Sequence, residues 1–240
     1  MKITYSTISK TGKRPNNEDA FRVIDMPKKN RWMGIVCDGM GGHNFGEVAS
    51  ETVVSKISEF WTRNRAIPDS EEKVIKACKK ASVAIDEKSF ELNHCQMGTT
   101  MVMASIEGNK VTIAHIGDSR CYLIRPGYYD YNNVENTDTD HVLYQTNDHV
   151  SHDYEWELVT KCFFSYHPEK AEPEIVQFEI QSGDRLLLCS DGVYKCIDSK
   201  VLKARIMDAK VPDDMLQAIE SGYERYGQDN YTAIMAIINE

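Results

Sequence analysis

The fold of this chain is decided by the stretch Trp32-Met33-Gly34-Ile35-Val36-Cys37-Asp38-Gly39-Met40-Gly41-Gly42-His43. Its first half, residues 32–37, is an apolar run that predicts a buried strand. Asp38 follows that run, and the three glycines after it remove side chains from the turn, so that another group can approach the backbone closely. A carboxylate beside bare carbonyls is an oxygen environment that suits a hard cation. Asp-Gly turns also arise for purely conformational reasons, so this stretch alone leaves both interpretations open.

The composition is that of an ordinary globular protein, with 240 residues of which 41% are hydrophobic and 27% charged. A formal net charge of -9 argues against a nucleic-acid partner. No segment approaches the roughly 18 apolar residues of a membrane span, and the first residues lack an apolar signal region. The seven cysteines contain no CxxC pair, which favours free thiols in a reducing compartment. We therefore expect a cytoplasmic protein without a membrane segment.

The remaining pattern predicts antiparallel strands and amphipathic helices. Strands are expected at residues 2–8, 20–26, 31–37, 99–106, 111–116, 121–124, 174–180, 185–189 and 231–238. Helices are expected at residues 47–64, from a cap at Asp69 or Ser70 to about residue 92, and at residues 200–207 and 212–226. Short turns such as Gly108-Asn109 leave no room for crossover helices, which indicates an antiparallel meander. Without repeats or a linker, residues 1–240 are predicted to form one domain, with residues 126–173 as a polar surface excursion.

Acidic residues recur where the predicted strands begin or end. Asp38, Asp118 and Asp191 each follow an apolar strand, Asp229 precedes one, and Asp19 lies at the entry to another. Strand ends can converge on one edge, where clustered carboxylates repel one another unless cations lie among them. Oxygen ligands without zinc-type His/Cys spacing favour Mg²⁺ or Mn²⁺. Two such ions about 3.5–4 Å apart activate a water and polarise a phosphoryl group. Taken singly, each carboxylate also fits a turn or cap residue.

Six motifs occur in order between residues 12 and 232: Arg14-Pro15-Asn16-Asn17-Glu18-Asp19, Asp38-Gly39-Met40-Gly41-Gly42-His43, Gly98-Thr99-Thr100, Gly117-Asp118-Ser119-Arg120, Ser190-Asp191-Gly192 and Asp229-Asn230-Tyr231-Thr232. Together they resemble the PP2C (PPM) family of metal-dependent protein serine/threonine phosphatases, in the style of its bacterial Stp-like members. The resemblance implies an α+β fold, a four-layer α-β-β-α sandwich of two packed antiparallel sheets flanked by helices. It further implies that a metal-bridging hydroxide hydrolyses phosphoserine and phosphothreonine on proteins, opposing a Hanks-type kinase. We expect a monomer.

The resemblance also implies a ligand set for two Mn²⁺ or Mg²⁺ ions. Asp38 would bridge both ions, and the Gly39 carbonyl would bind the second. Asp191 and Asp229 would complete the first site, while Asp19 would hold waters of the second.

Other positions match the family's third metal site and its substrate-binding and acid groups. Asp118, with Asp191, corresponds to the third, weaker metal site of bacterial members. Arg14 would hold the substrate phosphate bidentately, which suits a guanidinium. Animal members carry a general-acid His two positions after the bridging Asp, and here that position is Met40. His43 is then a candidate catalytic acid, with a structural role at the helix start and a metal-bound water as the alternatives.

The chain departs from the family between residues 126 and 173. Asn147-Asp148-His149-Val150 resembles the family's Asp-His-Ser segment and His167-Pro168-Glu169 its His-Pro segment, but the region is shortened and the Thr-Arg-Ala-Leu-Gly segment is missing. Substrate selectivity is therefore not carried over. Two other functions stay open, a non-catalytic phosphoprotein-binding module and a small-molecule phosphomonoesterase. An acidic residue at every expected ligand position favours the enzyme.

Overall fold

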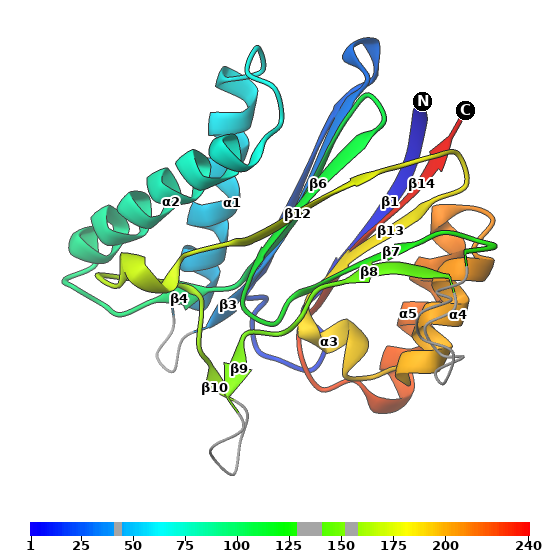
Figure 1. The fold of residues 1–240 in the computed structure, drawn as a ribbon. Helices are drawn as coiled ribbons and strands as arrows, with labels where there is room; N and C mark the ends of the chain where they lie inside the picture. Colours follow the sequence, from blue (N-terminus) through cyan, green and yellow to red (C-terminus); the bar gives the residue numbers. More distant parts are fainter. Residues whose placement is uncertain (41–44, 129–140, 152–157) are drawn as a thin grey trace.

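The computed structural model describes residues 1–40, 45–128, 141–151 and 158–240 and has four layers, a helical pair, two packed sheets and a second helical group (Figure 1). The first sheet has the order β1-β14-β13-β7-β8, with β1 (Lys2–Lys10), β14 (Tyr231–Asn239), β13 (Arg185–Cys189), β7 (Arg120–Ile124) and β8 (Val142–Gln145). The second has the order β11-β4-β3-β5-β6-β12, with β11 (Phe163–Phe164), β4 (Gly98–Thr99), β3 (Arg31–Met40), β5 (Met101–Glu107), β6 (Lys110–Ile116) and β12 (Glu174–Glu179). β2 (Asp19–Met26) pairs with β3.

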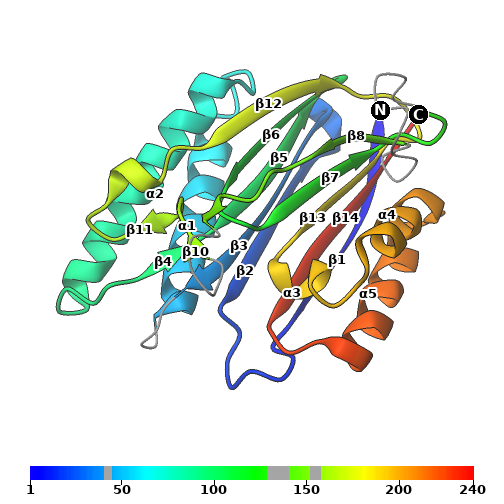
Figure 2. The same cartoon turned by 60° about the horizontal axis from the view of Figure 1, so that its bottom comes forward.

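Helices cover the outer face of each sheet (Figures 1 and 2). The second sheet packs against α1 (Gly46–Arg63) and α2 (Glu71–Glu91), and the first against α3 (Asp191–Tyr194), α4 (Ser199–Asp208) and α5 (Pro212–Tyr226). Every strand pairing in the described residues is antiparallel, including the small ladder of β9 (Val150–Ser151) with β10 (Leu158–Val159). The predicted α-β-β-α sandwich is therefore confirmed.

The alternation of side chains along β3 explains why one strand serves two cores. Trp32 and Val36 belong to the core between the sheets, whereas Met33 and Ile35 belong to the core beneath α1 and α2. Successive strand side chains point to opposite faces, so a strand buried on both faces reads as a continuous apolar run. That run positions Asp38 at the end of the strand where the two sheets meet the solvent.

Two local predictions need correction, and one short helix was not predicted. β3 does not end before Asp38 but continues to Met40, because Gly39 and Met40 pair with Thr99 and Gly98 of β4. The predicted strand over residues 99–106 is interrupted at Thr100, whose N–H donates to the Asp38 carbonyl at 2.9 Å. The short helix α3, which begins at Asp191 directly after β13, was not predicted.

Part of the region predicted as a surface excursion belongs to the second sheet. Phe163 of β11 lies opposite Thr99 of β4 and is fully buried beneath α2. Residues 129–140 and 152–157 of this region lie outside the described residues. In the described part of the chain, no helix combines the length and the apolar character needed to cross a membrane.

Candidate metal centre

The backbone of Asp38 is fixed by the two threonines of the Gly98-Thr99-Thr100 motif. The Asp38 N–H donates to Thr100 Oγ1 at 3.0 Å, and Thr99 Oγ1 donates to the Asp38 carbonyl at 2.8 Å. Both bonds involve the main chain of Asp38, so they position the residue without using its carboxylate. Burial raises the pKa of Asp38 well above its usual range, and four other carboxylates raise it further: Asp19, Asp191, Asp118 and Asp229.

Asp19 lies directly opposite Asp38 in the β2–β3 ladder and is only 8% exposed. Ser190 Oγ donates to one oxygen of Asp19 at 2.7 Å, while the other, Oδ1, is buried without a hydrogen-bond partner. Burial raises the pKa of Asp19 to about 7, opposed in part by the bond from Ser190. A buried carboxylate oxygen without a donor has a cost that a bound cation would remove.

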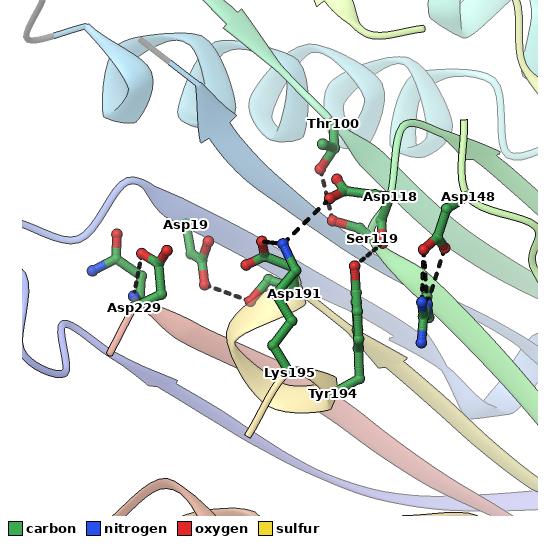
Figure 3. Close-up of polar contacts among 12 residues, drawn as sticks. Asp19, Thr100, Asp118, Ser119, Asp148, Asp191, Tyr194, Lys195 and Asp229 are labelled. Atoms are coloured by element: carbon green, nitrogen blue, oxygen red, sulfur yellow. Dashed lines mark hydrogen bonds and ion pairs between the residues drawn. The ribbon is translucent and has the colours of Figure 1, made fainter. Parts of the chain in front are cut away.

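Asp191 and Asp229 reach the same edge from the first sheet. Asp191 is the first residue of α3, directly after β13, and Asp229 lies just before β14. Figure 3 shows both side chains in one row with Asp19 and Asp118. Residues from both sheets, distant from one another in the sequence, therefore meet at one rim.

Asp118 occupies the far end of that row, on the turn between β6 and β7. It is 7% exposed, and burial together with the charge of Asp191 raises its pKa to about 6. The Tyr194 hydroxyl donates to the Asp118 carbonyl at 3.1 Å, which ties this turn to α3. Arg120 lies over the Tyr194 ring at 3.5 Å and makes two short bonds to the Asp148 carboxylate, at 2.9 and 2.7 Å.

Arg14 is placed at the opposite end of the row from Asp118. Its guanidinium donates to Asp229 Oδ2 at 2.7 Å, and its side chain is 55% exposed. The Arg14 side chain thus lies at the rim, where it contacts a predicted metal ligand. His43, the predicted catalytic acid, lies outside the described residues.

Two motif glycines are required by close backbone contacts. A Cβ atom on Gly39 would lie 2.2 Å from the Gly46 carbonyl oxygen, and one on Gly192 would lie 1.9 Å from the Asn230 carbonyl oxygen. Gly39 thereby brings the end of β3 against the start of α1. Gly192 lets α3 approach the segment that carries Asp229.

Sequence reasoning missed the structural role of Asn230. Its side chain donates to the carbonyls of Thr11 and Asn16, both at 2.8 Å, and accepts from the Glu18 N–H at 2.9 Å. Asn230 therefore holds both ends of the loop that carries Arg14. The Asp229-Asn230 pair stands out as a motif, but an amide that bonds only to backbone leaves no pattern of its own in the sequence. The position of Lys195 beside Asp191 and Asp118 was missed as well.

A second set of potential ligands consists of His115 on β6, His149 just before β9 and Glu174 at the start of β12. The two imidazole rings are stacked, with centroids 4.5 Å apart and an angle of 6° between the planes. Ring nitrogens bind metals in the plane of the ring, and no single ion lies in both of two stacked planes. His149 Nδ1 also accepts a hydrogen bond from the Gly117 N–H at 3.1 Å. His149 therefore supports the Gly117 turn, and the stacked orientation of the two rings disfavours a single ion bound by both imidazoles.

The residues of the acidic rim fit hard divalent cations. The side chains offer carboxylate oxygens, one of which, Asp19 Oδ1, is buried without a hydrogen-bond partner. Such an oxygen set selects Mg²⁺ or Mn²⁺ over zinc.

Known proteins share this sequence pattern and this architecture. A family model described as Protein phosphatase 2C matches residues 9–229. The serine/threonine phosphatase stp of Listeria monocytogenes serotype 4b (strain F2365) is 31% identical over 244 residues, covering 92% of this chain and 90% of that protein. The protein phosphatase PhpP of Streptococcus pneumoniae serotype 2 (strain D39) is 26% identical over 95% of this chain and 94% of its own length.

A solved protein phosphatase structure is similar to this chain in its overall fold. The catalytic domain of the serine threonine protein phosphatase PstP, in complex with two manganese ions, superposes with a TM-score of 0.77 at 26% identity over 99% of both chains. The family match, the sequence relatives and the architecture agree. The chain therefore belongs to the protein phosphatase 2C family.

Proposed function

We propose that this protein is a Mn²⁺- or Mg²⁺-dependent phosphatase that removes phosphate from serine and threonine residues of proteins. The observation that carries the proposal is that five aspartates lie close together at one rim. Four of them raise the pKa of the fifth, Asp38. Clustered carboxylates of this kind are stable at neutral pH when divalent cations neutralise them. Membership of the family supports the catalytic function over that of a non-catalytic module.

In this proposal the ligands follow the assignment drawn from the motifs. Asp38 would be shared by two ions, Asp191 and Asp229 would complete the first site, and the Gly39 carbonyl and Asp19 would serve the second. When bound, the ions supply Lewis acidity toward the phosphoryl oxygens and a nucleophile from water at neutral pH. The unpartnered Asp19 Oδ1 supports a role for this carboxylate toward a cation or its waters.

Arg14 is proposed to bind the substrate phosphate. Its guanidinium is more than half exposed beside the rim and already adjoins Asp229. A planar guanidinium offers two parallel N–H donors, so it can hold a phosphate while neutralising the charge that develops on its oxygens. His43 remains a prediction for the leaving-group acid, since Met40 carries no proton to give.

The test is a manganese-dependent assay on a phosphothreonine peptide with the wild type, Asp38→Ala and Asp191→Ala. Loss of turnover in both variants, with retained circular dichroism, supports the proposal, and equal activity in all three contradicts it. Comparing the peptide with nucleotides and sugar phosphates distinguishes a protein phosphatase from a small-molecule phosphomonoesterase. Calorimetric manganese binding distinguishes both from a non-catalytic module.

The cellular setting is inferred from general properties. We propose phosphorylated proteins as substrates, a Hanks-type kinase as the opposing enzyme, a monomer, and a cytoplasmic location. Seven free cysteines support a reducing compartment, and the net charge of -9 argues against nucleic acid. Residues 1–240 are proposed to act as one catalytic domain with residues 126–173 as its variable flap, because both sheets contribute to the same inter-sheet core.

A further inference from the structure

A lysine ammonium lies between the two carboxylates that the family resemblance assigned to a third metal ion. Lys195 Nζ is 2.6 Å from Asp191 Oδ2 and 4.0 Å from Asp118 Oδ2. Figure 3 shows the Lys195 side chain running along α3 with its nitrogen between the two aspartates. None of the six sequence motifs includes this residue.

The position of Lys195 is set by the helix that it follows. Asp191 and Lys195 are one helical turn apart, and the Lys195 N–H donates to the Asp191 carbonyl at 2.9 Å. Residues four apart on a helix face the same side, so the ammonium returns to the carboxylate at the helix start. The bond from Tyr194 to the Asp118 carbonyl brings the second carboxylate to the same place. The arrangement is thus built by the backbone of α3 and its contact with the β6–β7 turn.

The three side chains of this contact differ in burial. The side chains of Asp118 and Asp191 are 10% and 18% exposed, whereas that of Lys195 is 50% exposed. The Lys195 side chain is thus half-exposed, and its ammonium contacts two largely buried carboxylates. The charge of Lys195 lowers the pKa of Asp118, against the stronger effect of burial.

We propose that Lys195 takes the place of a third divalent ion, so that this phosphatase operates with two. The inference rests on the proposed function, since it presumes that the other aspartates hold metal. An ion bound to both Asp118 and Asp191 would need oxygen contacts of about 2.0–2.6 Å, which places it in the space of the ammonium. The ion and the Lys195 ammonium, both positively charged, would repel each other strongly at such close range in a partly buried site. A third ion must therefore displace Lys195, and its affinity is reduced accordingly.

The experiment is manganese titration by calorimetry, with bound manganese counted independently by electron paramagnetic resonance. Lys195→Gln removes the charge and keeps much of the length, while Lys195→Arg keeps the charge. Lys76→Gln is the matched control, because Lys76 makes a 2.6 Å bond with Glu72 four residues before it, on a helix remote from the rim. We expect two ions in the wild type, in Lys195→Arg and in the control.

In Lys195→Gln we expect a third ion to bind. If the wild type also binds a third ion weakly, we expect that third ion to bind at least about tenfold more tightly in Lys195→Gln. Adding Asp118→Asn to Lys195→Gln should return the count to two, which ties the new ion to this gap. Equal stoichiometry and affinity in the wild type and Lys195→Gln would overturn the inference and leave the two-ion proposal intact. Failure of the wild type to bind any manganese would overturn the proposed function and the inference with it.

Discussion

Asp19 and Asp38 face one another across the antiparallel pair of β2 and β3, in register and at the edge where both sheets end. Like charges directly opposite each other in a ladder are destabilising. The fold keeps this pair together through backbone bonds that do not depend on the carboxylates, among them Gly39 N–H to the Glu18 carbonyl at 3.0 Å. The metal-free protein therefore keeps the Asp19 and Asp38 carboxylates close together. Their repulsion depends on pH, because it requires both groups to be ionised.

The first prediction concerns the stability of the metal-free protein. Folding raises the pKa of Asp19 from 3.8 to about 7 and that of Asp118 from 3.8 to about 6. A carboxylate with a raised folded pKa binds more protons in the folded than in the unfolded state, so its contribution to stability is full below about pH 4 and is lost as the pH rises to about 7. We expect the melting temperature in chelator to fall over this window by several degrees. Calorimetric melting from pH 5 to pH 8 is the measurement.

Manganese should reverse that loss. A ligand that binds only the folded state at 100 times its Kd adds about 2.7 kcal/mol per site. The gain should be largest at pH 8, where protons no longer compete for the carboxylates. A metal-free melting temperature that rises between pH 5 and pH 7 would contradict the expected direction of the pH dependence.

The second prediction separates catalysis from stability at Asp38. Asp38→Asn should lower manganese-dependent turnover about 10³-fold or more, because the proposed bridging carboxylate is lost. The same variant should raise the melting temperature of the metal-free protein, since it removes a buried charge beside other carboxylates. Asp25→Asn, an exposed residue near the far end of β2, is the control and should change neither quantity. Parallel loss of turnover and stability would point to simple misfolding.

The third prediction concerns Arg14. Arg14→Lys retains the charge but replaces a planar fork with a point charge. We expect KM for a phosphothreonine peptide to rise about tenfold with a smaller change in kcat, since phosphate binding precedes the chemical step. Arg22→Lys serves as the control, because Arg22 is exposed and only 3.5 Å from Glu51. An unchanged KM would remove Arg14 from the substrate site.

The fourth prediction tests the close packing behind the rim. Gly192→Ala places a Cβ atom 1.9 Å from the Asn230 carbonyl oxygen, so α3 and the Asp229 segment must separate. Gly108→Ala meets nothing within 4 Å, and only its positive φ of +63° opposes the substitution. Urea unfolding should show Gly192→Ala to be at least about 2 kcal/mol more destabilising than Gly108→Ala. Similar free energies of unfolding for the two variants would contradict the steric argument.

Elements with strong periodicity could be predicted from the sequence. The apolar run over residues 32–37 and the helical spacing after Glu47 located β3 and α1 to within a few residues. The extension of β3 through Asp38 to Met40 could not be predicted, because it depends on pairing with the distant strand β4. The two-residue strand β11 carries too few residues for any period to show.

The acidic residues of the candidate site were named from motifs, but their partners were not. Arg14 and Asp229 are 215 positions apart, and nothing local to either residue indicates that they meet. Lys195 follows Asp191 at helical spacing, yet a four-residue helix gives no amphipathic signal that would place the ammonium at the rim. Contacts of this kind follow from the tertiary structure alone.

The pairing of β1 with β14 has a practical consequence for experiments. Lys2 lies opposite Asn239, while at the other end of the pair Lys10 lies opposite Tyr231, two residues after Asp229. Figure 2 shows the N and C termini together at one end of this strand pair. A nine-residue strand spans roughly 30 Å, so both chain ends emerge far from the aspartates. Immobilising the protein on a sensor surface through either end would leave the acidic edge facing the solution, accessible to bulky phosphorylated proteins.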